Sequence, residues 1–234
     1  TPIYRALQDV SVIAISRSQA STAVGVPVAA VIHHGIDVRA LPTGCGDGDY
    51  ASFLGRMAPE KGPRQAALIA RAAGVPLRMA AKIREPAERD YFEAEVRPLL
   101  CSEVEYVGEL GFEDKITLVG GSFALLNPIQ WSEPFGLVMI EALATGTPVV
   151  ATPAGSAPEI IDDGVTGHLR SGLLPLATAL LEAPSLDRDA CRAAALERFD
   201  TQRMVDDHIR VYEDLAKGRR RATPRVVGAE ARVS

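Results

Sequence analysis

The loop from Gly55 to Pro63 combines residue types that suit an anion. Arg56 and Lys61 supply two cations, and the glycines beside them let the backbone approach a ligand closely. The loop follows a short apolar run and precedes a helix that begins at Pro63, so the free amides of the first helical turn lie near the cations. This arrangement predicts a site for a phosphate or diphosphate. An ordinary strand-to-helix turn with solvated charges stays open as the alternative.

A second loop, from Trp131 to Glu141, places two carboxylates around a predicted helix start. Glu133 precedes the helix and Glu141 lies inside it. On the helical period, Glu141 shares a side with the apolar Leu137 and Ala144, a setting that a plain surface carboxylate avoids. Trp131, the only tryptophan, is expected to pack beneath the Glu133 loop. Taken alone, the two carboxylates are equally consistent with a capping acid and a surface acid.

Short apolar runs alternate with longer helical patterns along the chain. This order is typical of βαβ units and predicts an α/β fold, with a parallel sheet and helices on both faces. Ligands of such sheets bind at the carboxyl ends of the strands, where both loops begin. The pattern Ser156-x-x-Glu159 predicts a capping box. The expected strands are 10–16, 29–33, 50–54, 77–81, 104–107, 123–126 and 149–151, and the expected helices are 63–73, 86–97, 113–119, 136–145, 156–162, 173–183, 189–199 and 202–217.

A cluster of Pro, Gly and Asp between Leu41 and Asp49 marks a predicted domain boundary. The part before it is too short to be a domain, whereas the part after it has the length of one. We interpret the chain as the end of an amino-terminal domain with its linker (residues 1–43), a main domain (44–200), a carboxy-terminal helix (201–216) and a disordered basic tail (217–234).

Composition narrows the function classes. The 234 residues are 47% hydrophobic and 24% charged, which is typical of a globular protein, and no apolar run reaches the ~18 residues of a membrane span. Three cysteines, far apart in the sequence, indicate neither a disulfide framework nor a zinc site, and favour the cytoplasm. The net charge is −5, and the basic residues that concentrate in the tail leave an acidic body. This balance argues against nucleic acid as a partner.

Four stretches, 53–62, 133–142, 146–150 and 155–167, occur in the order and at the spacing found in group 1 (family 4) glycosyltransferases. The chain resembles the donor-binding half of that family from about Ile32 to Leu215. The resemblance implies a GT-B architecture, in which this chain forms one Rossmann-like half preceded by a remnant of the other. It also implies a retaining enzyme that needs no metal and no cofactor. Such an enzyme moves a hexosyl group from a nucleoside-diphosphate sugar to a sugar, lipid or small-molecule acceptor.

The resemblance also assigns roles to single residues. Arg56 and Lys61 would hold the diphosphate of the donor and stabilise its charge as the sugar leaves. Glu133 would contact the transferred sugar, and Glu141 would accept hydrogen bonds from the ribose hydroxyls. Ile83 and Arg84 lie where such enzymes seat the nucleobase. The other donor-binding residues that the resemblance implies are Gly55, Phe135, Gly136, Leu137 and Val138.

Two other functions stay open at this point. Family members carry a whole amino-terminal acceptor domain, whereas only residues 1–43 precede the linker here, so we expect a fragment or a truncated chain. A non-catalytic nucleotide-sugar-binding module and a nucleotide-sugar epimerase of related architecture are therefore the alternatives. A glycosidase would also use two carboxylates, but it would leave the cations at 56 and 61 unexplained.

Two patterns that could bind a metal are interpreted as structural. Asp47-Gly48-Asp49 matches the pattern of metal-dependent sugar-nucleotide enzymes, but it precedes a strand and does not follow one. His33 and His34 are adjacent and would face opposite sides of a strand, so they cannot share an ion. The sequence therefore predicts no metal site.

Overall fold

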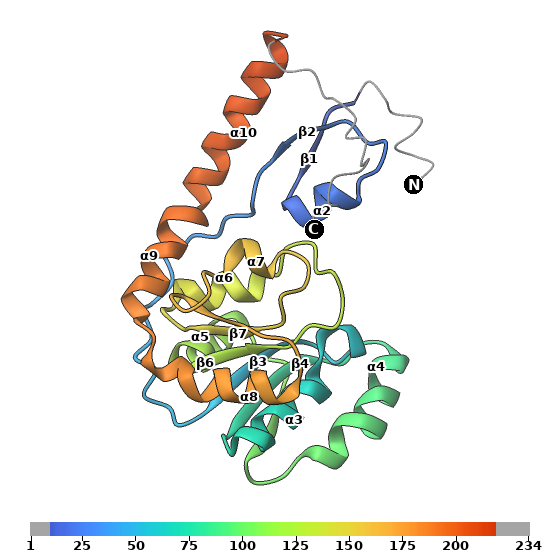
Figure 1. The fold of residues 1–234 in the computed structure, drawn as a ribbon, viewed down its shortest axis with the longest axis vertical. Coiled ribbons are helices and arrows are strands. Elements are labelled where there is room, and N and C mark those ends of the chain that lie inside the picture. Colours follow the sequence, from blue (N-terminus) through green and yellow to red (C-terminus); the bar gives the residue numbers. More distant parts are fainter. Residues whose placement is uncertain (1–9, 219–234) are drawn as a thin grey trace, which may run out of the picture.

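The computed structural model describes residues 10–218, which form a small amino-terminal segment and a larger α/β domain (Figure 1). The segment is a βαβ unit of β1 (Val12–Ala14), α2 (Arg17–Thr22) and β2 (Val28–Val31), whose two strands pair in parallel. Ser16 caps α2, because its hydroxyl accepts a hydrogen bond from the amide three residues later. The two strands expected at the start of the chain are confirmed, although both are shorter than predicted.

The larger domain is built on a six-stranded sheet in which all neighbouring strands run parallel. The order β5-β4-β3-β6-β7-β8 shows that the chain adds strands on one side of β3 and then crosses to its other side. In such sheets ligands bind where this direction reverses, which here is between β3 and β6. The strands are β3 (Ala51–Arg56), β4 (Leu77–Lys82), β5 (Val104–Gly108), β6 (Ala124–Asn127), β7 (Val149–Ala151) and β8 (Gly167–Leu169).

Helices cover both faces of the sheet, as the sequence predicts (Figure 1). On one face α3 packs against α8, and on the other α6 packs against α9. Successive strand residues serve opposite faces, so Phe53 belongs to the first core and Leu54 to the second. The helices are α3 (Pro63–Ala73), α4 (Pro86–Tyr91), α5 (Phe112–Gly121), α6 (Leu137–Ala144), α7 (Ala157–Ile160), α8 (Leu173–Glu182), α9 (Arg188–Arg198) and α10 (Thr201–Ala216).

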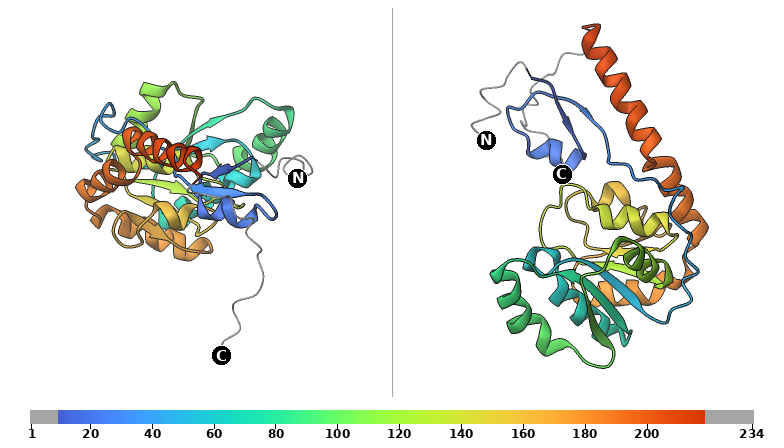
Figure 2. Two further views of the ribbon diagram at one scale, coloured as in Figure 1. Left: turned by 90° about the horizontal axis from the view of Figure 1, so that it is seen from above. Right: turned by 180° about the vertical axis from the view of Figure 1, so that it is seen from behind.

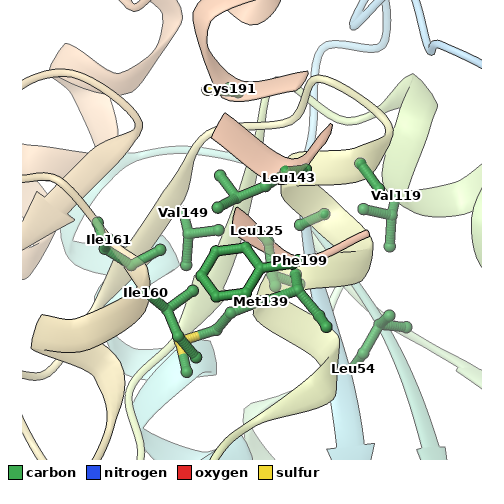
Figure 3. Close-up of a cluster of buried hydrophobic side chains, with 14 of the residues drawn as sticks. Leu54, Val119, Leu125, Met139, Leu143, Val149, Ile160, Ile161, Cys191 and Phe199 are labelled. Carbon is green, nitrogen blue, oxygen red and sulfur yellow. The ribbon is translucent and has the colours of Figure 1, made fainter. Parts of the chain in front are cut away.

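The core on the α6 and α9 side contains Phe199, which is fully buried just after α9 (Figure 3). Its ring lies among Met139 of α6, Leu125 of β6 and Ile160 of α7. One aromatic side chain thus joins three elements around the end of α9. This packing holds α6 in place, and α6 is the helix that carries the second predicted site loop.

Two elements differ from the sequence prediction. Strand β8 was not predicted, because Gly167, His168 and Leu169 show neither alternation nor a β-branched run. The helix expected over 86–97 is α-helical only to Tyr91 and continues as a π turn and a 3₁₀ turn that ends at Leu99. Pro98 has no amide to donate, which favours this early change of helical type.

Helix α10 runs back along the amino-terminal segment, so parts of the chain far apart in sequence lie side by side (Figure 2). Arg203 of α10 donates hydrogen bonds to the carbonyls of His33 and His34. Gly35 passes so close to the helix start that a Cβ atom there would lie 2.7 Å from the Asp200 carbonyl oxygen. The apolar side of α10 is only partly covered, since Val205, Ile209 and Tyr212 remain exposed.

Two further predictions concern the ends of the chain and the membrane. Between residues 10 and 218, no helix is both long and apolar enough to cross a bilayer. The tail expected to be disordered, residues 217–234, lies outside the described residues except for its first two positions.

Glu159 does not form the predicted capping box with Ser156. The Ser156 hydroxyl donates to the Phe135 carbonyl instead, and α7 begins without a side-chain cap. The Glu159 carboxylate accepts hydrogen bonds from the Arg17 and Ser18 amides, both at 2.8 Å, and contacts His33 Nε2 at 3.0 Å. It therefore caps α2, a helix 141 residues earlier in the chain. The contact of Glu159 with α2 thus takes the place of the capping box that the local sequence predicts.

We expect this contact to depend on pH. Burial would raise the pKa of Glu159, but the hydrogen bonds from the Arg17 and Ser18 amides and from His33 outweigh it and hold the pKa below its usual 4.5. The stability that the carboxylate contributes is therefore complete above about pH 4.5 and is lost as the pH falls through the lower, folded value. Glu159→Gln should reduce the free energy of unfolding at pH 7 by about 1–3 kcal/mol, and this difference should vanish in acid. Urea denaturation at several pH values measures it.

The control is Glu197→Gln, which removes an exposed carboxylate on α9. It should leave the unfolding free energy nearly unchanged across the same pH range. If Glu159→Gln behaved like this control at pH 7, the contact with α2 would not stabilise the fold.

Candidate functional site

A cavity of about 700 Å³ opens at the carboxyl edge of the sheet, where the loops after β3, β4 and β5 meet the start of α6. A second cavity of about 270 Å³ adjoins it. Leu54, Gly55, Lys61, Leu137 and Val138 line both cavities. The two cavities therefore form one site with a larger lobe and a smaller lobe. This site lies at the reversal point between β3 and β6, as expected for a doubly wound sheet.

The structure brings together all but one of the residues that the sequence analysis selects for the site. Arg56, Arg84 and Glu141 line the larger lobe, whereas Glu133, Phe135 and Gly136 line the smaller lobe. The other members are shared by both lobes: Gly55, Lys61, Leu137 and Val138.

Ile83 is the exception. It follows β4 on the side that faces the α3 and α8 core, where it is half-buried, and it is not part of the lining of either lobe. Arg84, which the resemblance assigns together with Ile83, does line the larger lobe, as does Glu85. Successive residues of an extended chain alternate between two sides, so Ile83 and Arg84 face different surroundings.

Arg56 ends β3 and is held by two carboxylates. Its guanidinium donates to Glu60 at 2.7 Å and lies 3.4 Å from Glu88. The Arg56 side chain is 53% exposed, so these contacts are weak and a ligand can replace them. Glu88 is buried beside the cavity, and the hydrogen bond from the Arg84 amide holds its pKa below the usual range. A fixed negative charge thus orients the guanidinium toward the larger lobe.

Lys61 and Glu133 form an ion pair between the two predicted site loops. Trp131 completes this contact, because its indole Nε1 donates to Glu133 Oε2 at 3.0 Å and its ring lies 5.2 Å from the Lys61 ammonium. Trp131 is 41% exposed, so it does not lie beneath the loop as the sequence analysis expects. Its polar and cation contacts at the cavity rim explain this position.

The start of α6 faces the site with its free backbone amides. Gly136 caps the helix with a φ of +89°, a conformation that favours glycine, and this turn brings the next two residues, Leu137 and Val138, to both lobes. Phe135 anchors the turn, since it is buried and its ring meets the His34 ring edge-on at 5.1 Å. Unpaired amides at a helix start attract anions.

Glu141 lies in the second turn of α6 and pairs with Lys115 of α5. Its Oε1 accepts a hydrogen bond from the Lys115 ammonium at 2.6 Å, and only 13% of the Glu141 side chain is exposed. The same ammonium lies 5.0 Å from the centre of the Phe112 ring. The sequence analysis places Glu141 among apolar neighbours, but the structure gives it a cationic partner and exposes Leu137. Lys115 contacts only Oε1 of Glu141, so Oε2 can accept a hydrogen bond from a ligand in the larger lobe.

Several lining residues are missed by the sequence reasoning. Lys115 could have been found, because the loop from β5 to α5 also leaves the sheet at its carboxyl edge. Asn127, the last residue of β6, carried a similar positional signal. Ile15 and His34 of the amino-terminal segment also line the smaller lobe. No local pattern predicts that contact, since it depends on how the segment packs.

The residues of the rejected metal pattern lie away from the site. Asp47 and Asp49 precede β3 and are therefore at the amino edge of the sheet, opposite the two lobes. Among residues 10–218, no group of three His, Cys, Asp or Glu side chains is arranged to hold a metal ion.

Comparison with known proteins identifies the family. The family model described as Glycosyl transferases group 1 matches residues 49–183, which include both site loops and the strands between them. The chain belongs to this family. Its six-stranded parallel sheet flanked by helices is that of one half of a GT-B glycosyltransferase.

Individual relatives agree with this assignment. The chain is 30% identical over 168 residues to D-inositol 3-phosphate glycosyltransferase of Mycolicibacterium smegmatis, covering 61% of the chain and 36% of that protein. It is 28% identical over 137 residues to N-acetyl-alpha-D-glucosaminyl L-malate synthase of Bacillus anthracis, covering 51% and 36% respectively. The chain thus spans about a third of the length of these curated relatives.

Solved structures extend the likeness to most of the chain. AviGT4, a glycosyltransferase involved in avilamycin A biosynthesis, superposes with a TM-score of 0.76 at 28% identity, covering 88% of this chain and 64% of that one. HepE of Anabaena, solved with UDP-glucose, superposes with a TM-score of 0.69 at 24% identity, covering 88% and 63%. At that identity HepE shows the fold alone.

The Glu133 loop packs on the turn that precedes α7. The Ser156 amide donates to the Glu133 carbonyl at 3.0 Å, and Gly155 has a φ of +60°. A Cβ atom at Gly155 would lie 2.2 Å from the Glu133 carbonyl oxygen and 2.4 Å from its amide nitrogen. Backbone therefore packs directly on backbone here, and only glycine permits it.

We expect Gly155→Ala to displace the Glu133 loop. Gly164→Ala is the matched control, because Gly164 also has a positive φ, +80°, but a Cβ there meets nothing within 4 Å. In the control, the free energy of unfolding should fall by about 1–2 kcal/mol, because alanine is strained in the left-handed conformation. Gly155→Ala should lower the free energy of unfolding by more than the control does. It should also change the fluorescence emission of Trp131, the single tryptophan, because Trp131 contacts Glu133. Urea denaturation followed by tryptophan fluorescence measures both effects. Equal losses and unchanged emission would contradict this account.

Proposed function

We propose that this chain forms the donor site of a retaining glycosyltransferase that takes a hexosyl group from a nucleoside-diphosphate sugar. One observation supports this most: Arg56, Lys61 and the amides at the start of α6 converge on one two-lobed site with Glu133 and Glu141. The cations and amides suit a diphosphate, and the carboxylates suit hydroxyl groups on either side of it. The relatives named as glycosyltransferases act on sugars, which agrees with this proposal.

The diphosphate would lie between the loop after β3 and the start of α6. Breaking the bond between the sugar and its phosphate oxygen leaves negative charge on that phosphate. Arg56 and Lys61 would stabilise this charge, so the site supplies positive charge from side chains and the proposal needs no metal ion. Both cations already face carboxylates, so the ligand would take the place of Glu60 beside Arg56 and compete with Glu133 for Lys61.

The ribose would lie in the larger lobe beside Glu141. A carboxylate accepts hydrogen bonds from two neighbouring hydroxyls, and Lys115 holds one of its oxygens so that the other keeps its direction. The transferred sugar would then lie in the smaller lobe with Glu133, because the diphosphate of the donor lies between the ribose and the sugar. A sugar, a lipid or a small molecule would be the acceptor.

We expect the chain to bind UDP or another nucleoside diphosphate in the presence of EDTA. Arg56→Ala and Lys61→Ala should each weaken this binding about tenfold to a hundredfold, because a hydrogen bond to a charged group contributes about 1.5–3 kcal/mol. Arg64→Ala is the control, since Arg64 pairs with Glu95 on the surface and does not line the site. Calorimetric titration of UDP, GDP and ADP measures the affinities. Binding that requires Mn²⁺ or Mg²⁺ would contradict the metal-independent proposal.

The two glutamates should respond differently to substitution. Glu141→Gln should weaken UDP binding and should also abolish any preference for UDP over 2′-deoxy-UDP, because its proposed partner is the ribose. Glu133→Gln should keep or improve UDP affinity, because it releases Lys61 from its ion pair. In the full-length protein, Glu133→Gln should lower kcat with little change in donor KM. Equal effects of the two variants would contradict this division of roles.

A non-catalytic nucleotide-sugar-binding module is the remaining alternative. It would bind the same donor with the same residues, so binding data do not separate it from an enzyme. A transfer assay with the full-length protein does: a donor that is bound but never consumed, with any of a panel of sugar, lipid and small-molecule acceptors, would favour the module.

A further inference from the structure

Asn127 has a buried side-chain amide nitrogen, Nδ2, that has no hydrogen-bond partner in the described part of the chain. Asn127 ends β6 at the reversal point of the sheet and is 4% exposed. Buried polar groups without a partner are rare, because each costs free energy that folding must offset. Such a group needs an explanation, and a ligand atom is one.

The position of Asn127 shows where that ligand atom would be. Asn127 lines the smaller lobe together with Lys61 and Glu133, and it does not line the larger lobe. Its backbone is already committed, since it pairs with Ala151 of β7 and its carbonyl accepts from the Ile129 amide at 2.9 Å. Only the side chain is free to bind, and the space beside it is the smaller lobe.

We propose that the Asn127 amide binds hydroxyl groups of the transferred sugar and helps to select that sugar. This inference rests on the proposed donor site. An amide offers a donor and an acceptor side by side, which matches hydroxyl groups, because each of these also donates and accepts. A phosphate offers acceptors alone. Glu133 in the same lobe would repel a phosphate but accept from a hydroxyl, so the smaller lobe suits a neutral sugar ring.

Other features of the smaller lobe also suit a neutral sugar. His34 lines it, and burial, with a smaller contribution from His208, lowers the pKa of His34, so the ring is neutral near pH 7. The volume, about 270 Å³, is less than half that of the larger lobe, about 700 Å³, as expected if one lobe holds a sugar and the other a nucleotide. Asn127 thus supplies the polar contact on the sheet side of the sugar, opposite the Glu133 loop.

The test compares two ligands that differ only in the sugar. Asn127→Leu keeps the shape of the side chain but cannot form hydrogen bonds. UDP affinity should change less than twofold, whereas UDP-glucose or UDP-N-acetylglucosamine, whichever the wild type binds more tightly, should bind about fivefold to thirtyfold more weakly. The melting temperature should stay the same or rise, because the substitution removes no hydrogen bond within the protein. Asn127→Ser, with a shorter side chain that still donates, should lose less sugar-nucleotide affinity.

Gln65→Leu is the matched control. Gln65 also has a buried amide oxygen without a partner, but it lines a separate cavity between α3 and α8, on the opposite face of the sheet. This variant should leave both affinities unchanged. Titration calorimetry and thermal unfolding of the 234-residue chain provide the measurements.

Each outcome decides between the possibilities. If Asn127→Leu weakens UDP and the sugar nucleotide equally, the amide binds phosphate and the sugar role is wrong. If it weakens neither, or only lowers the melting temperature, the amide is structural. A wild-type chain that binds neither UDP nor a UDP-sugar would overturn the proposed donor site itself, and with it this inference.

Discussion

The ion pair between Lys61 and Glu133 joins two loops that are 72 residues apart in the chain. These loops can meet only because β3 and β6 are neighbours in the sheet and both point their carboxyl ends to the same edge. The direction in which strands are added to the sheet reverses between β3 and β6, so the helices that follow these two strands lie on opposite faces and leave a space between the loops. The strand order therefore creates the space for the site, and the side chains then determine its chemistry.

Charge balance is the second constraint on this site. The larger lobe faces five cationic and four anionic side chains, and most of them pair with each other across the lobe. Arg56 is 53% exposed and pairs at little net gain, whereas Lys61 and Glu133 are 24% and 14% exposed and lie in a less polar setting. A diphosphate would thus recruit Arg56 easily but would compete with Glu133 for Lys61. In the proposed reaction, the residue that releases Lys61 is also the one that faces the sugar.

Local patterns predict those parts of the fold that local chemistry decides. Helix α3 has the predicted bounds, because Pro63 favours its first turn and Gly74 ends it in the left-handed conformation. The Arg56, Lys61, Glu133 and Glu141 assignments also followed from loop position on a parallel sheet. The contact of Glu159 with α2 could not be assigned in this way, because it depends on packing across the chain. Lys115 and Asn127 lie at positions that the same rule marks, but the Lys115 contact with Glu141 and the unpaired Asn127 nitrogen also depend on packing. Ile83 lies outside the lining of both lobes because the extended segment after β4 turns its side chain toward the α3 and α8 core.

The smaller lobe depends on one short turn and helix, residues 155–160. Gly155 and Ser156 hold the backbone of Glu133 from one side, through a close approach and a hydrogen bond. Three residues later, Glu159 holds the start of α2 in the amino-terminal segment, and that segment supplies Ile15 and His34 to the lobe. Both walls of the lobe are therefore fixed to the same support. Because Ser156 is fully buried and Gly155 leaves no room for a side chain, the support cannot shift without moving Glu133. The shape offered to a sugar is thus tied to the position of the amino-terminal segment, although no residue of that segment belongs to the sheet that builds the site.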